Sequence, residues 1–288
     1  MKRFLAVGAM GGVALAYALV PIVLHFALGA GLGVAALIVA QFLLSLVMIL
    51  GWSSVRRQSW VPPRQSWTVL GLLGVSIVLT DIAYYQSLAR LPVASAVLLL
   101  FQFPWMAMGI EAIWNRQWPS WRGWALAAGM WGGTVLALHP GHLHVGLGLI
   151  WGVMAGVGYA VTLVLAARIP TGLSTAERLV LPTLAGLVLA LGFYWATGPS
   201  APGWPIALFG PALALDGFLI PTALLVTVGS HVGGAGGALL AAGELPLAVG
   251  LAVLVLGQSV APTQWIGVGI VVLVIILAAR AANPPRPP

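Results

Sequence analysis

Two polar side chains stand beside prolines in the middle of long apolar stretches. Gln102 precedes Pro104 by two residues, and Glu244 precedes Pro246 in the same way, 142 residues further along the chain. A proline lacks the N–H group that would bond the carbonyl four residues earlier, and a polar side chain is costly in lipid. Such a pair either kinks a packed helix or lines a cavity that binds a small molecule. Because both prolines carry a polar neighbour, we favour the cavity.

A second group of candidate residues lies on one helix face. Asp81, Tyr84 and Tyr85 are spaced i, i+3 and i+4, so their side chains project from the same side of a helix. Further aromatic residues occur near mid-depth of other apolar stretches, and aromatic rings suit a flat apolar substrate or an ammonium group. The predicted substrate-binding residues are Tyr17, Asp81, Tyr84, Tyr85, Gln102, Trp105, Tyr159 and Glu244, with Pro104 and Pro246 as positions where a helix breaks or gates.

Carboxylates within membrane-spanning stretches are candidate functional residues, because a charged group is costly in lipid. Asp81 and Glu244 lie deeper in their stretches than Glu111 and Asp216. Either of the two deep carboxylates can pair with a substrate ammonium or take up a proton, and Glu244 can instead be a neutral acid bonded to the backbone. Proton coupling therefore stays open. Basic residues are absent from the deep positions, which disfavours sugar phosphates and nucleotide sugars as substrates.

Composition places these residues in a membrane protein. Hydrophobic residues make up 61% of the 288 positions and charged residues only 6%, with a mean hydropathy of +1.06. A soluble domain has about a quarter of its residues charged. Ten apolar runs of membrane-spanning length are predicted, at roughly 4–26, 32–51, 67–88, 93–113, 122–138, 146–167, 178–197, 209–230, 236–256 and 263–282. The first is too long for the apolar core of a signal peptide, so we interpret it as a membrane helix.

Basic residues indicate the orientation of these helices. With the N-terminus and the C-terminus in the cytoplasm, only Arg90 of the basic residues lies outside. The other eleven are Lys2, Arg3, Arg56, Arg57, Arg64, Arg116, Arg122, Arg168, Arg178, Arg280 and Arg286. The basic residues then face the anionic headgroups of the lipid bilayer, which accounts for the net charge of +7. We therefore expect no nucleic acid as a partner. We expect a multi-pass protein of the cell inner membrane, with residues 284–288 as a disordered tail.

The two halves of the chain resemble each other. The Gly8–Val13 segment matches Gly152–Val157, and Trp121-Arg122-Gly123 matches Trp265-Ile266-Gly267 at an offset of 144. The repeats are predicted at residues 1–139 and 145–283. Because each contains an odd number of helices, five, the second enters the membrane from the opposite side, as in an inverted-topology repeat.

The second half carries the residues of a family resemblance. Glu244-Leu245-Pro246 is followed by Leu256-Gly257-Gln258 and then Gln264-Trp265-Ile266-Gly267. This order resembles the EamA-type members of the drug/metabolite transporter superfamily, although Gln258 stands where that family usually has glutamate. The resemblance implies a ten-helix transporter fold over essentially the whole chain. Tyr84, Tyr85 and Trp105 further resemble the YddG-type exporters of aromatic amino acids.

These observations predict an exporter of small amphipathic metabolites. Neutral and aromatic amino acids are the expected substrates, namely phenylalanine, tryptophan and tyrosine, with threonine and methionine as further candidates. A broad efflux pump for drugs or lipophilic cations is the alternative, with the deep carboxylates as countercharges. The sequence carries no motif of an intramembrane enzyme and no P-loop, so we expect no catalytic activity, no metal or cofactor, and transport driven by a gradient. The oligomeric state stays open, and with it a channel formed by several copies.

Overall fold

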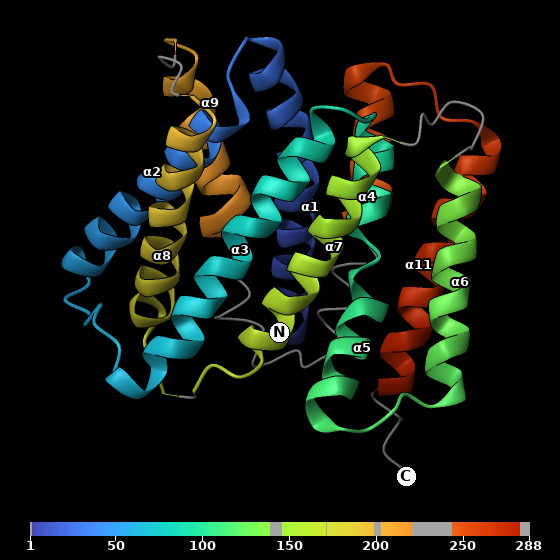
Figure 1. Cartoon of the computed structure of the whole chain (residues 1–288), viewed down its shortest axis with the longest axis horizontal. Coiled ribbons are helices and arrows are strands. Elements are labelled where there is room, and N and C mark those ends of the chain that lie inside the picture. Colours follow the sequence, from blue (N-terminus) through green and yellow to red (C-terminus); the bar gives the residue numbers. More distant parts are fainter. Residues whose placement is uncertain (1, 139–145, 171, 199–202, 221–243, 283–288) are drawn as a thin grey trace.

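A computed structural model describes residues 2–138, 146–170, 172–198, 203–220 and 244–282, and this part of the chain is helical without strands (Figure 1). Its elements are α1 (Lys2–Gly29), α2 (Val34–Val55), η1 (Arg64–Ser66), α3 (Trp67–Leu88), α4 (Val93–Leu100), α5 (Phe103–Asn115), α6 (Trp121–Leu138), α7 (Leu147–Ala166), α8 (Thr175–Ala196), α9 (Ile206–Leu213), η3 (Ala214–Leu219) and α11 (Pro262–Ala282). One more helix, Glu244–Leu256, precedes α11. The predicted junction at 139–145 and the tail at 284–288 lie outside the described residues.

The apolar runs of the sequence fold into these helices because a backbone in lipid must satisfy its own hydrogen bonds. Among the described residues, five helical segments are long and apolar enough to cross a membrane: Val34–Val55, Arg64–Leu88, Val93–Asn115, Leu147–Ala166 and Thr175–Ala196. The described part of the chain is therefore all-helical and has the features of a membrane protein. The run predicted at 67–88 has the same bounds as α3.

The fourth run is two helices rather than one. α4 ends at Leu100 and α5 begins at Phe103, so the span is interrupted at Phe101 and Gln102. Pro104 lies in the first turn of α5, where its missing N–H leaves no helical bond unmade. The interruption coincides with the polar residue and proline that stand out in the sequence.

Glycines bring α7 close to this interruption. An added Cβ at Gly152 would lie 2.5 Å from Cδ1 of Leu99, and one at Gly156 would lie 3.1 Å from the Leu99 carbonyl oxygen. α7 also packs along α3, where Gly158 adjoins Thr80. Small residues allow such close backbone approach between membrane helices, so α7 is held against both α3 and the α4–α5 break.

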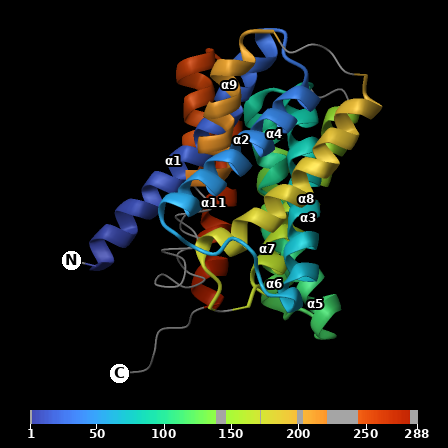
Figure 2. The same ribbon diagram turned by 90° about the vertical axis from the view of Figure 1, so that its left-hand side faces the viewer.

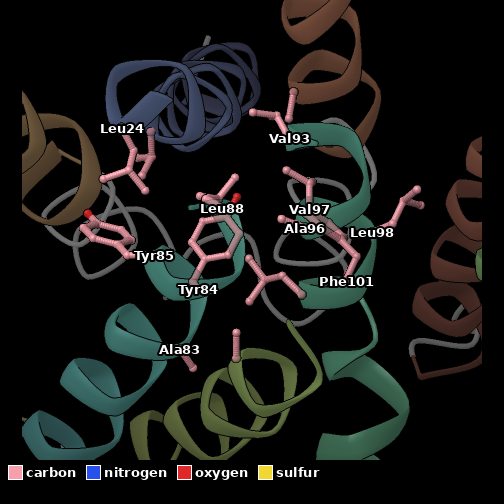
Figure 3. Packing of buried hydrophobic residues seen from close by; sticks show 14 of the residues in the cluster. Leu24, Ala83, Tyr84, Tyr85, Leu88, Val93, Ala96, Val97, Leu98 and Phe101 are labelled. Atoms are coloured by element: carbon pink, nitrogen blue, oxygen red, sulfur yellow. The ribbon is translucent and has the colours of Figure 1, made fainter. Parts of the chain in front are cut away.

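The bundle has α3 near its centre, between α8 on one side and α4 and α7 on the other (Figure 1). α2 packs on α8 at one edge of the bundle, and α6 packs on α11 at the opposite edge. Figure 2 shows α1 crossing the bundle obliquely beside α2 and α9. The buried apolar core includes Leu24, Tyr84 and Val97, which face a common interior between α1, α3 and α4 (Figure 3).

One end of the bundle carries most of the described basic residues. α3 and α8 begin, and α5 and α7 end, toward the lower end in Figure 1. The sequence places Arg64, Arg116, Arg168 and Arg178 at or beside these helix termini. Arg90, in contrast, follows the other end of α3. We refer below to the end bearing these arginines as the basic end.

Candidate functional site

The deepest polar contact joins α2 to α3 through Gln41. Its Nε2 atom donates a hydrogen bond of 3.0 Å to Oδ2 of Asp81, and its Oε1 atom accepts one from the Tyr85 hydroxyl. Gln41 and Tyr85 are each only 1% exposed. Buried polar groups are normally hydrogen-bonded, and here one amide bonds to both side chains, through Oδ2 of Asp81 and the hydroxyl of Tyr85. Asp81 and Tyr85 are one turn apart, so the network fixes the orientation of the carboxylate.

A π-helical turn lies against the same face of α2. The hydroxyl of Ser45, one turn beyond Gln41, donates to the Ala214 carbonyl at 3.4 Å. Gly217 approaches so closely that an added Cβ would be 3.7 Å from Nε2 of Gln41. Asp216, in the same turn, is half-buried and interacts electrostatically with Tyr85. π-Turns are rare and frequently occur at functional sites. The sequence did not predict this turn.

Tyrosines from three helices lie within electrostatic range of Glu244. Tyr17 of α1, Tyr84 of α3 and Tyr159 of α7 all interact electrostatically with its carboxyl group. Tyr17 and Tyr159 also interact through their hydroxyls. The Tyr159 ring meets Phe103 edge-on, with 4.7 Å between centroids. Four of the predicted site residues are thus brought together from segments far apart in the sequence.

A cavity of about 160 Å³ opens beside these residues between α3, α7 and α8. Asp81, Tyr17 and Tyr159 lie toward its deep end, and Arg178 lies toward the basic end of the bundle. The remaining lining residues are Leu73, Ile77, Thr80, Thr162, Leu163, Ala166, Ile169, Leu179, Pro182, Gly217 and Phe218. Apolar cavities of about 150 Å³ hold benzene, so this space has the size of a phenyl ring. Its wall is mainly apolar, with few charged groups.

Asp81 is the carboxylate that lines this cavity. Oδ2 accepts the bond from Gln41, and Oδ1 has no hydrogen-bond partner among the described residues. A carboxylate that lies in an apolar wall with one oxygen unpaired is stabilised by a cation, by water or by uptake of a proton. The site can therefore bind an ammonium group whose apolar remainder contacts Tyr17 and Tyr159.

Gln102 and Trp105 form a separate cluster that is not part of the cavity lining. Nε2 of Gln102 donates to Oγ1 of Thr134 on α6 and, at 3.3 Å, to the Leu98 carbonyl. The Trp105 indole N–H donates to Oε1 of Gln102 at 3.2 Å, and its ring adjoins Trp131. The Gln102 side chain is only 2% exposed. Both N–H donors of its amide and one of the two lone pairs of its oxygen are therefore bonded within the protein. These contacts tie the α4–α5 break to α6.

Pro246 lies in the described helix Glu244–Leu256, two residues after its first residue. It is half-buried, and Leu245 beside it is completely buried. The segment that precedes Glu244 lies outside the described residues, so the predicted break at this proline stays a prediction.

Sequence reasoning missed three side chains that the structure places at these sites. Gln41 carries the only amide in the apolar run of α2, which was an available signal. Nothing in the local sequence indicated that Thr134 accepts a hydrogen bond from Gln102, because the two residues are 32 positions apart. Arg178 appeared to serve only as a basic residue at a helix terminus, yet it lines the cavity.

The sequence matches no family model and no curated protein. Twenty solved chains have a similar fold. One of them, described only as a crystal structure of a protein, superposes with a TM-score of 0.67 over 95% of this chain and 97% of its own. The two sequences are 19% identical. The likeness therefore concerns the fold alone, and it extends over nearly the whole length of both proteins.

Proposed function

We propose that this protein is a membrane transporter that exports neutral and aromatic amino acids through its central cavity. The observation that carries the proposal is the position of Asp81 in an apolar cavity of about 160 Å³, beside Tyr17 and Tyr159. The carboxylate suits the ammonium group of an amino acid, and the tyrosine rings suit its apolar or aromatic side chain. Asp81 has no basic lining residue at its depth, since Arg178 lies toward the basic end, which favours small neutral amino acids over phosphorylated metabolites at the deep site.

We also propose ten membrane-spanning segments arranged as two inverted five-helix repeats of the EamA type. The packing supports this arrangement. α3 packs on α7 and α8, and the α9–η3 segment packs on α1 and α2. An inverted repeat relates these two sets of contacts, because it pairs the third segment with the eighth, the first with the sixth and the second with the seventh. The same inverted repeat exchanges α2 with α8 and α6 with α11, so the observed α2–α8 and α6–α11 contacts each map onto themselves.

The proposed orientation puts the basic end of the bundle in the cytoplasm, in a cell inner membrane. Arg64, Arg116, Arg168 and Arg178 all accompany helix termini at that end, as the positive-inside rule requires. The cavity extends from Asp81 toward this end, so in this conformation the substrate would enter from the cytoplasm. Rocking of the two halves around Asp81 and Tyr159 would then open the site to the outside.

Uptake of labelled phenylalanine into proteoliposomes tests this function directly. We expect uptake that threonine and methionine compete for, and its response to an imposed pH gradient determines whether protons are coupled. Asp81→Asn should abolish most of the uptake because it removes the charge that faces the ammonium. Glu111→Gln is the matched control, since Glu111 is exposed near the end of α5.

Two results would contradict the proposal. Absence of phenylalanine uptake by the wild-type protein, together with stabilisation by a quaternary ammonium dye, would favour the drug-efflux alternative. Equal uptake by Asp81→Asn and wild-type protein would remove Asp81 from the substrate site.

A further inference from the structure

We propose that Arg178 forms a second binding site for the substrate carboxylate at the mouth of the cavity, occupied before the substrate ammonium reaches Asp81. This inference rests on the proposed function and specifies how the same cavity recognises the second charged group of an amino acid. Arg178 and Asp81 are the oppositely charged residues among those that line the cavity.

The side chain of Arg178 is held in place with its anion-binding face available. Its Nε atom donates to the Leu173 carbonyl at 3.2 Å, which anchors the guanidinium to the loop before α8. The two terminal amino groups have no hydrogen-bond or ion-pair partner among the described residues. Arg178 is half-buried and adjoins the apolar cavity residues Ile169 and Leu179. A guanidinium with both terminal nitrogens free presents the planar pair of donors that a carboxylate accepts.

The neighbouring acid does not neutralise this arginine. The Oε2 atom of Glu177 accepts the Ser174 backbone N–H at 2.8 Å, and the Ser174 hydroxyl accepts the Glu177 backbone N–H at 3.2 Å. This reciprocal capping box satisfies the first turn of α8. It occupies the Glu177 carboxylate with the backbone, and no ion pair joins Glu177 to Arg178 in the described part of the chain.

The distance between the two charges requires them to act in succession. Gly74 of α3 lies at the level of Pro182 of α8, because an added Cβ at Gly74 would be 2.2 Å from the Pro182 carbonyl oxygen. Asp81 is seven residues above this level and Arg178 four below it, which separates their Cα atoms by roughly 16 Å along the helices at about 1.5 Å per residue. An α-amino acid carries both charged groups on one carbon atom. The bond from its Nε atom to the Leu173 carbonyl holds the Arg178 guanidinium toward the basic end, away from Asp81. With the guanidinium held there, the substrate contacts the two residues in succession.

The order of the contacts follows from the direction of the cavity. Arg178 lies at the basic end, where the substrate would arrive from the cytoplasm, and Asp81 lies deeper. Apolar walls strengthen the attraction between a fixed positive charge and an incoming carboxylate, because they lower the local dielectric constant. The guanidinium selects molecules with a carboxylate before the deeper site selects the ammonium and the ring.

Arg168 supplies a matched control at the same end of the bundle. Its Nη1 atom donates to the Val164 carbonyl, and its guanidinium lies over the Trp114 ring at 4.5 Å. Arg168 is not among the residues that line the cavity. Removal of its charge changes the overall charge of the basic end by the same amount as removal of the Arg178 charge.

The test compares phenylalanine with phenylalaninamide, which keeps the ammonium and the ring but has no carboxylate. Uptake of both compounds is measured in proteoliposomes for the wild type, Arg178→Gln, Arg178→Lys and Arg168→Gln. We expect Arg178→Gln to raise the KM for phenylalanine at least about tenfold, as loss of one charge-assisted contact predicts. The KM for phenylalaninamide should stay within about twofold of the wild-type value. Arg178→Lys should have an intermediate KM, because lysine keeps the charge but loses the bidentate geometry.

The outcomes separate the two proposals. Phenylalanine uptake by the wild type with an unchanged KM in Arg178→Gln would overturn the carboxylate site and leave the transporter intact. A parallel rise for phenylalanine and its amide, or an equal effect of Arg168→Gln, would also overturn it. Failure of the wild type to transport phenylalanine would overturn the proposed function itself. If Arg178→Gln does not elute as a single folded species in gel filtration, the selective rise in the KM of Arg178→Lys decides the question.

Discussion

The closest backbone approach between α3 and α8 provides a quantitative test of the packing beside the cavity. At Gly74, an added Cβ atom would lie 2.2 Å from the carbonyl oxygen, 2.7 Å from Cα and 2.8 Å from the carbonyl carbon of Pro182. Favourable contacts between nonbonded heavy atoms occur at about 3.5–4.0 Å. Gly74→Ala therefore places its Cβ atom about 0.7–1.3 Å closer to three backbone atoms than the shortest favourable separation. No side-chain rotation can relieve this overlap, so the two helices must separate.

Gly71 offers the control for this substitution. It lies one turn earlier on the same helix, and an added Cβ there would have no neighbour within 4 Å. Overpacking costs about 1–3 kcal/mol, and the rigid backbone at Pro182 favours the upper part of that range. The helix-propensity gain of alanine over glycine applies equally to both variants and cancels. The two variants should thus differ in the free energy of unfolding by about 2–3 kcal/mol.

Thermal unfolding of the detergent-solubilised protein, followed by gel filtration with tryptophan fluorescence, measures this difference. A change of 1 kcal/mol shifts the midpoint of a protein of this size by about 2 °C, so Gly74→Ala should melt about 4–6 °C below Gly71→Ala. Leu73 and Pro182 both line the cavity, and transport should therefore fall with stability in Gly74→Ala. Equal midpoints for the two variants would refute the close contact between α3 and α8.

Two further predictions concern the buried amides. Gln41→Leu removes two hydrogen bonds and leaves Asp81 and Tyr85 without their partner. At about 0.6 to 1.7 kcal/mol for each membrane hydrogen bond, it should cost about 1–3 kcal/mol and lower both the melting temperature and phenylalanine uptake. Wild-type uptake by Gln41→Leu would show that the network does not orient Asp81. Thr134→Val removes the side-chain acceptor of Gln102 on α6; we expect a loss of about 0.6 kcal/mol with an unchanged KM, measured by thermal unfolding and by uptake. A raised KM in Thr134→Val would place Gln102 in the substrate site.

The sequence predicted the helical segments well because their signal is local. An apolar run of about 20 residues must become a helix in lipid, and α3 has the bounds expected from composition alone. The interruption of the fourth run likewise coincides with a local feature, the polar residue before Pro104. The π-helical turn at Ala214–Leu219 has no such signal. Its geometry depends on contacts with α2, such as the bond from Ser45 to the Ala214 carbonyl.

The direction of each polar side chain was harder to predict than its depth. A helix that is apolar all round gives no periodic pattern from which to infer its buried face. Gln102 is predicted to line the pathway, and the sequence contains no signal for its bond to Thr134 on α6. Gln41 was overlooked although it lies at similar depth, because its partner Asp81 is 40 residues away. Both amides are satisfied by partners on other helices, which only the tertiary fold specifies.

The two proline positions differ in their surroundings, and the difference suits an asymmetric substrate. Gln102 bonds to Thr134 and accepts from the Trp105 indole, so its amide is occupied by the protein. Glu244, at the corresponding position of the second half, lies among tyrosines from α1, α3 and α7. In the proposed inverted repeat, two identical positions would present two similar polar groups to one substrate. The proposed amino-acid substrate has unlike ends, so a site that binds it in one orientation needs unlike groups. We infer that the first half uses its polar residue to hold the break between α4 and α5 rigid, whereas the second half contributes its carboxyl group to the tyrosine cluster near the cavity.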